Sequence, residues 1–199
     1  MHISRYLACV LLLSETNEFL RLVINSVKND LNSHNEEIQS LALACVANVG
    51  GREFAETLAP DVQRILLSPS SKNQCRKKAA LCMLRLLRKY PEGFDELTSD
   101  FKDKLLDLLE DTSLGIVSAT MSLLIGLVAH NPEDWGENTV YKACKLLAKL
   151  NHTNAFKEYG QEYVYYKTIC PWLQVKILRL LYIIYIYITH THTHTHTHT

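Results

Sequence analysis

The sequence lacks the residue clusters from which enzymes and metalloproteins build their sites. Only seven glycines occur in 199 residues, and the pair at Gly50-Gly51 is not followed by the GK[ST] of a phosphate-binding loop. It contains no nucleophile with a recognisable base, no glycine-rich cradle and no cluster of metal ligands. His34, His130 and His152 are isolated at predicted helix ends, where solvation or capping is the usual role. We therefore expect no catalytic activity, no cofactor and no metal.

The six cysteines form no CxxC pair and have no short Cys-His spacing typical of structural zinc sites. Most lie at apolar positions of helical patterns, where cysteine behaves as a small buried hydrophobic residue. This usage predicts free thiols in a reducing compartment rather than a disulfide framework.

Neither an excess of charge nor a long apolar run is present. Lys and Arg total 21, as do Asp and Glu, so no overall field favours nucleic acid or an anionic membrane. The run Leu7–Leu13 after Arg5 resembles the start of a secretory signal, but it is short and lacks a cleavage motif. We expect a buried helix there. No uncharged apolar stretch reaches the roughly 18 residues of a membrane span.

What the sequence does contain is helix after helix, with apolar residues recurring every three or four positions. Residues 35–49 are the clearest case, with Ser33 and Glu36 as a predicted capping box and Gly50-Gly51 as the stop. Further helices are predicted over 71–90, 100–110 and 113–130, the last almost free of charge. No segment predicts a sheet.

The helices repeat. Cys45 aligns with Cys82, and Cys82 with Ser122, at separations of 37 and 40 residues. A period of about 40 residues with one helical hairpin per unit is typical of HEAT and armadillo repeats. Because one hairpin cannot bury its apolar face alone, the hairpins must stack. The predicted fold class is all-α, an α-solenoid of HEAT/armadillo-like helical hairpins.

A run of cations is the first candidate for function. Seven occur between residues 72 and 89 without an acid among them, and Lys72, Arg76, Lys77 and Lys78 are the candidate contacts to an anionic surface such as lipid headgroups. The alternative is that the run faces the acidic residues that follow between 92 and 111, or is simply solvated.

An aromatic cluster, YGQEYVYYKTICPW, is the second candidate. Its Tyr159, Tyr163, Tyr165, Tyr166 and Trp172 are residue types that favour interfaces. They could equally pack a loop onto the solenoid, because Tyr buries its ring while its hydroxyl stays wet.

Several long words of the sequence resemble the trunk of clathrin adaptor large chains. These are RLVINSVKNDL, SLALACVANVGGREFAETLAPDVQRIL, KKAALCMLRLLRKYPE, LGIVSATMSLLIGLVAHNPE and YVYYKTICPWLQVKILRLL. The last is most similar to the alpha class, the alpha-adaptins. The resemblance covers about residues 5–181 and corresponds to an interior piece of the family's trunk.

The resemblance implies a non-catalytic scaffold subunit in clathrin-mediated endocytosis and vesicle-mediated protein transport. Implied partners are a small sigma chain, a beta large chain and a medium mu chain, and the implied location is cytoplasmic and peripheral on the plasma membrane at coated pits. The family contacts clathrin and phosphoinositides through regions outside these residues, so no such residue is assigned here. No nucleic-acid partner is implied. The alternative is a free-standing HEAT/armadillo module that binds peptides.

The similarity stops at Tyr182, where YIIYIYITHTHTHTHTHT follows. TAT and ATA encode Tyr and Ile, and ACA and CAC encode Thr and His, so a TA repeat running into a CA repeat would be translated as this tail. We therefore expect an adaptin trunk fragment over 1–181 and a low-complexity tail over 182–199. A functional tail is the alternative, and its histidines would bind nickel or zinc in vitro in either case.

Reversing two charges tests the lipid hypothesis. If Lys77 and Lys78 contact anionic headgroups, the Lys77→Glu, Lys78→Glu double variant should bind acidic liposomes more weakly, because each cation near such a surface contributes about 1 kcal/mol. Unchanged co-sedimentation with the liposomes would contradict the hypothesis.

Overall fold

A computed structural model describes residues 2–13, 18–152 and 159–196, and it is helical almost throughout this part of the chain. The α-helices are α1 (His2–Leu12), α2 (Leu20–Leu31), α3 (Glu36–Val49), α4 (Arg52–Leu67), α5 (Asn73–Lys89), α6 (Ser99–Asp107), α7 (Leu114–His130), α8 (Glu137–Leu150) and α10 (Pro171–His196). Short 3-10 helices are η1 (Pro91–Phe94), η2 (Leu108–Glu110), η3 (Pro132–Asp134) and η4 (Gln161–Tyr163). The predicted helices are thus confirmed, with ends shifted by at most three residues.

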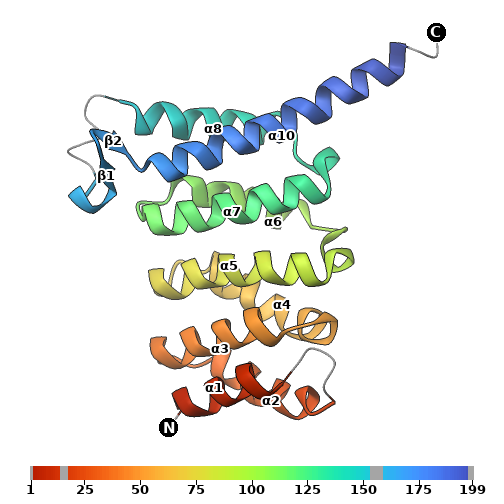
Figure 1. Ribbon diagram of the computed structural model, residues 1–199, viewed down its shortest axis with the longest axis vertical. Helices are drawn as coiled ribbons and strands as arrows, with labels where there is room; N and C mark the ends of the chain where they lie inside the picture. Colours follow the sequence, from red (N-terminus) through yellow and green to blue (C-terminus); the bar gives the residue numbers. More distant parts are fainter. Residues whose placement is uncertain (1, 14–17, 153–158, 197–199) are drawn as a thin grey trace. The chain divides into compact units, whose positions relative to one another are not determined.

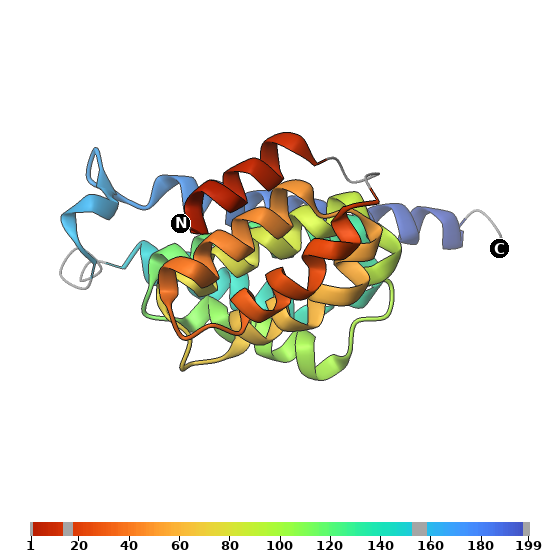
Figure 2. The ribbon, with the colours of Figure 1, turned by 90° about the horizontal axis from the view of Figure 1, so that it is seen from below.

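The chain divides into two compact units, Met1–Leu123 and Leu124–Thr199. In the first unit α3 lies against both α1 and α5, and α2 lies against α4, so that odd- and even-numbered helices form two layers (Figure 1 and Figure 2). Each hairpin buries its apolar face on the next, as the repeat period predicts. The all-α solenoid prediction is confirmed.

The core of the first unit consists of aliphatic and aromatic side chains from every layer. Phe54, Leu58 and Ile65 of α4 are at most 1% exposed, as are Leu86 of α5 and Phe101 of α6. Burying each such side chain stabilises the fold by about 1.5–3 kcal/mol relative to leaving it in water.

The two ends of α3 show how local chemistry differs from the predicted pattern. The N-cap is Asn35, whose side-chain oxygen accepts from the backbone N–H groups of Glu37 and Ile38. Ser33 instead accepts from the Asn35 N–H, so the predicted capping box of Ser33 with Glu36 was wrong. Gly50 does end the helix, but its φ is −59°. It is needed for space, because a Cβ there would overlap the Val46 carbonyl oxygen and lie 3.1 Å from Phe54 Cβ.

The first helix is less buried than expected. In α1, Tyr6 is 8% exposed and its hydroxyl donates to Asp30 Oδ2 at 2.6 Å. Leu7, Leu11 and Leu12 are all more than half exposed. The helix expected over this run is present, but only one of its faces is covered.

The second unit contains the only sheet among the described residues. Strands β1 (Val164–Tyr165) and β2 (Thr168–Ile169) form a short antiparallel hairpin. The expectation that no segment forms a sheet was therefore wrong. The hairpin leads into α10, which lies against α8.

Helix α10 continues through the predicted tail boundary. It runs without a break from Pro171 to His196 and buries Ile184, and the Tyr187 hydroxyl donates to Glu133. Its segment Pro171–Thr191 is long and apolar enough to cross a membrane by length and composition alone. It includes the charged Lys176 and Arg179. The division at residue 181 stays a prediction from the sequence.

A charge at Leu124 should abolish the fold around it. This side chain is fully buried in α7, and Leu124→Asp would place an unpaired carboxylate among apolar neighbours at a cost of about 4 kcal/mol or more. Urea unfolding followed by circular dichroism measures the loss. Leu22→Asp, at a side chain that is 76% exposed, is the matched control, and equal unfolding midpoints for the two variants would contradict the placement of Leu124.

Candidate functional site

The four candidate cations at the start of α5 differ in their exposure. Lys72 and Lys77 are exposed and Lys78 is half-buried. Arg76 is only 8% exposed. Its Nη1 lies 2.9 Å from Asp111 Oδ2, and its Nε donates to the Leu66 carbonyl at 3.3 Å. Arg76 thus joins α5 to the end of α4 and to the residue after η2, and contact with an anionic surface through the other three stays a prediction.

Two further cations of the same run bind backbone carbonyls. The Arg85 Nε donates to the Ala47 oxygen at 3.3 Å, and the Lys89 Nζ donates to the Asn48 oxygen at 3.0 Å. Both acceptors lie in the last turn of α3, where carbonyl groups lack helix partners and the dipole favours cations. The acidic residues between 92 and 111, expected as partners of this run, thus account for Arg76 but not for these two bonds of Arg85 and Lys89. Backbone acceptors leave no trace in charge patterns, and for that reason the sequence did not predict them.

The aromatic cluster forms the hairpin and its flanks. The rings of Tyr165 and Tyr166 meet edge to face with centroids 4.6 Å apart, and Tyr166 is 86% exposed. The Lys149 Nζ lies over the Tyr159 ring, 5.8 Å from the ring centroid. Both Tyr166 and Lys167, with φ of 46° and 64°, have the left-handed backbone that a tight hairpin turn requires. The cluster therefore contains both packed and exposed rings, and both uses proposed from the sequence stay open.

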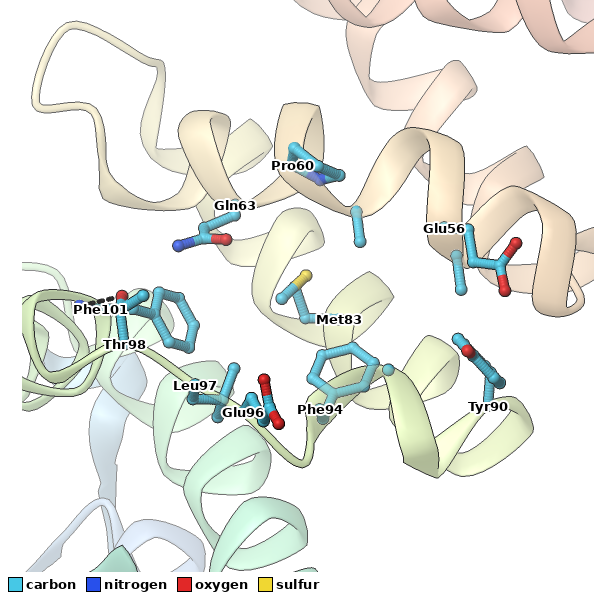
Figure 3. A pocket seen from close by; sticks show the side chains of 13 residues that line it. Glu56, Pro60, Gln63, Met83, Tyr90, Phe94, Glu96, Leu97, Thr98 and Phe101 are labelled. Carbon is cyan, nitrogen blue, oxygen red and sulfur yellow. Dashed lines mark hydrogen bonds between the residues drawn. The ribbon is translucent and has the colours of Figure 1, made fainter.

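A hollow of the first unit, partly open to solvent, lies beside α4 and was not predicted. It has a volume of about 360 Å³ and is bounded by α4, α5, η1 and the start of α6 (Figure 3). Thirteen residues line it: Ala55, Glu56, Ala59, Pro60, Gln63, Met83, Tyr90, Gly93, Phe94, Glu96, Leu97, Thr98 and Phe101. We call it the α4 pocket. Its residues come from segments up to 46 positions apart, and none belongs to a recognisable motif.

The floor of the α4 pocket is apolar and fixed by the core. Met83, Phe94 and Phe101 are each at most 4% exposed, so their positions are set by packing. Ala55 and Ala59 end at Cβ and leave the space above them open. The pocket is therefore preformed, as binding sites usually are.

One wall of the α4 pocket is held by a charged group of three side chains. Arg52 Nε donates to Glu56 Oε1 at 2.8 Å, and its guanidinium lies 5.1 Å from the centroid of the Tyr90 ring. Hydrogen bonds from Arg52 and, more weakly, from Tyr90 hold the pKa of Glu56 below its usual value. Gly93 allows this arrangement, because a Cβ there would lie 2.7 Å from Tyr90 Cδ1.

A second, more open hollow of about 760 Å³ adjoins the α4 pocket. It shares Pro60 and Gln63 with that pocket and extends past Arg64 and Leu67 to Asp107 on α6. Its cations are already paired, as in the 2.8 Å contact of Lys104 Nζ with Asp100 Oδ2. The two hollows together follow the outer side of α4 for more than two turns.

The part of the chain that the structure describes contains no group of three or more His, Cys, Asp or Glu that could hold a metal. All six cysteines are free. Burial raises the pKa of the Cys45 thiol to about 12, so this thiol stays protonated near neutral pH. The histidines beyond Thr191 lie outside the described side chains.

In the part of the chain that the structure describes, these features define a helical-repeat protein with a pocket beside α4. The profile of the adaptin N terminal region matches residues 5–195, and the chain belongs to this family. The resemblance of its sequence segments to clathrin adaptor large chains is confirmed.

The similar proteins are adaptor subunits from distant organisms. AP-2 complex subunit alpha-1 of Arabidopsis thaliana is 44% identical over 176 residues, which are 88% of this chain and 17% of that protein. AP-2 complex subunit alpha-2 of Dictyostelium discoideum is 41% identical over 88% of this chain and 17% of that protein. AP-1 complex subunit gamma-like 2 of mouse is 35% identical over 90% of this chain and 22% of that protein. The chain spans about a fifth or less of the length of these relatives.

Removing Arg76 should destabilise the first unit far more than removing a surface cation. Arg76→Met leaves the Asp111 carboxylate nearly buried without its partner, since the two side chains are 9% and 15% exposed. We expect a loss of about 3–5 kcal/mol in the free energy of unfolding. Urea titration at two salt concentrations measures it, because a buried pair is screened little.

The matched control is Lys104→Met, which breaks the surface pair with Asp100, where the side chains are 55% and 72% exposed. Such a pair contributes less than about 1 kcal/mol. Equal losses in the two variants would show that the Arg76 pair is not a structural tie.

Proposed function

We propose that this chain is a piece of the alpha-type large subunit of a clathrin adaptor complex and acts there as a non-catalytic scaffold. The observation that carries the proposal is the continuous alignment of 176 residues with AP-2 alpha subunits, at 44% identity in Arabidopsis. The lower identity to the gamma-like subunit of AP-1, 35%, favours the alpha type. A scaffold role also fits a core built by stacking, since the helix faces not used in stacking are available for partners.

The partners proposed for this scaffold are the small sigma chain, the beta large chain and the medium mu chain of the complex. Its proposed place is the cytoplasmic side of the plasma membrane, at clathrin-coated pits, where the complex serves endocytosis and protein transport. Clathrin and phosphoinositides would be bound by parts of the subunit outside these residues. The chain itself would position the other subunits through shape and surface chemistry.

The second candidate is a free-standing helical-repeat module that binds peptides. The α4 pocket favours it, because its floor is preformed and its lining combines apolar and polar groups. The two candidates differ in a measurable way. A scaffold piece should associate with adaptor subunits, whereas a free-standing module should be indifferent to them.

A segment exchange tests the scaffold proposal. We expect an Arabidopsis AP-2 alpha-1 subunit that carries residues 5–180 of this chain in place of its matching segment to assemble with sigma, beta and mu chains. It should also restore uptake of a labelled membrane cargo in cells that lack the native subunit. The same chimera with Leu124→Asp is the control for folding of the inserted segment. A folded chimera that does not purify with a sigma chain would contradict the proposal.

A further inference from the structure

The charged residues that line the α4 pocket are of one sign, although Arg52 lies beside its wall. None of its thirteen lining residues is Lys or Arg, whereas Glu56 and Glu96 both line it. Glu56 is paired with Arg52. Glu96 is exposed, and no ion pair is recorded for it within the described residues. Figure 3 shows its side chain between Leu97 and Phe94, at the edge of the apolar floor. The pocket therefore offers an apolar surface with an adjacent carboxylate.

This combination suits a cation beside an apolar side chain. A Lys or Arg can lay its aliphatic stem along Phe94 while its charged head meets Glu96. Anionic ligands are disfavoured, because a phosphate group would approach carboxylates with no lining cation to compensate. The same charges thus argue against nucleic acid or an anionic lipid headgroup as the occupant.

The backbone of α4 adds a feature that favours a polypeptide. Pro60 lies inside the helix and has no N–H, so it cannot donate the helix bond to the Glu56 carbonyl. Both residues line the pocket. The Glu56 carbonyl therefore lacks the donor that an uninterrupted helix would supply. Because the adjoining hollow continues past Pro60 and Gln63, an extended segment has room to run along α4.

We propose that the α4 pocket binds an extended segment of another protein, with one aliphatic or methionine side chain on Met83, Phe94 and Phe101 and an adjacent Lys or Arg against Glu96. This inference goes beyond the scaffold proposal and does not depend on it.

Peptide selection on the full 199-residue chain tests the proposal. Random twelve-residue peptides displayed on phage are selected on the immobilised chain, and the enriched peptides are then synthesised and titrated by fluorescence anisotropy. We expect enrichment of Lys or Arg next to Leu, Ile or Met. Ala59→Trp, which fills the pocket from a half-buried position, should weaken the binding of these peptides by about tenfold or more.

Charge reversal gives a second arm that does not disturb packing. Glu96→Lys should also lower the affinity for the basic peptides by about tenfold. Selection on this variant should enrich Asp or Glu beside the apolar residue. Glu92→Lys, in η1 and outside the pocket lining, is the matched control and should leave binding unchanged. Circular dichroism checks that each variant is folded. If Ala59→Trp does not fold, the comparison of Glu96→Lys with Glu92→Lys alone tests the proposal.

Three results would overturn the proposal. The first is no enrichment above the background on bare support. The second is an enriched set without the basic and apolar pair. The third is peptides that bind the Glu96→Lys and Glu92→Lys variants equally well.

Discussion

Burial of apolar helix faces between neighbouring hairpins is the constraint on which the first unit depends. A single hairpin cannot bury its apolar faces alone. In this unit α3 therefore lies between α1 and α5 in one layer, α2 lies on α4 in the other, and α4 also packs on α5. Local features follow from this stacking. Gly50 leaves room at the end of α3 for the Val46 carbonyl and for Phe54 of α4, and Leu86 of α5 also lies close to it.

The cations of α5 are used within this stack more than a charge pattern indicates. The Arg76 guanidinium pairs with Asp111 and donates to the Leu66 carbonyl. Arg85 and Lys89 donate hydrogen bonds to carbonyl groups at the end of α3. A helix end leaves carbonyl groups without partners, and a long cationic side chain on the neighbouring helix can reach them. Part of the basic stretch of α5 therefore caps the C-terminal end of α3, the helix that precedes it in the same layer. Of the four candidate cations, Lys72, Lys77 and the half-buried Lys78 remain for an outside ligand.

The repeat, the helices and the family could be predicted because each depends on long, redundant patterns. The apolar stripes of α3, α5 and α7 survive any single deviation, and the family words extend over most of the chain. Features set by a few residues could not be predicted in this way. Asn35 rather than Ser33 is the N-cap of α3, because it lies directly before the first helical turn. The hairpin was not predicted, because its strands have only two residues each. The α4 pocket depends on alanines and a proline, residues that a search for reactive groups passes over.

The ties between helices of the first unit join residues that are close in sequence. The bond from Tyr6 to Asp30 spans 24 residues, that from Arg85 to Ala47 spans 38, and that from Lys89 to Asn48 spans 41. Each closes a loop of about one repeat or less, and the entropy cost of loop closure is lower for such loops than for longer ones. Such a topology has low contact order and reaches its native pairings quickly. As the chain leaves the ribosome, each helix therefore meets its partners after one further hairpin has emerged, and the unit can fold in the order in which it is synthesised.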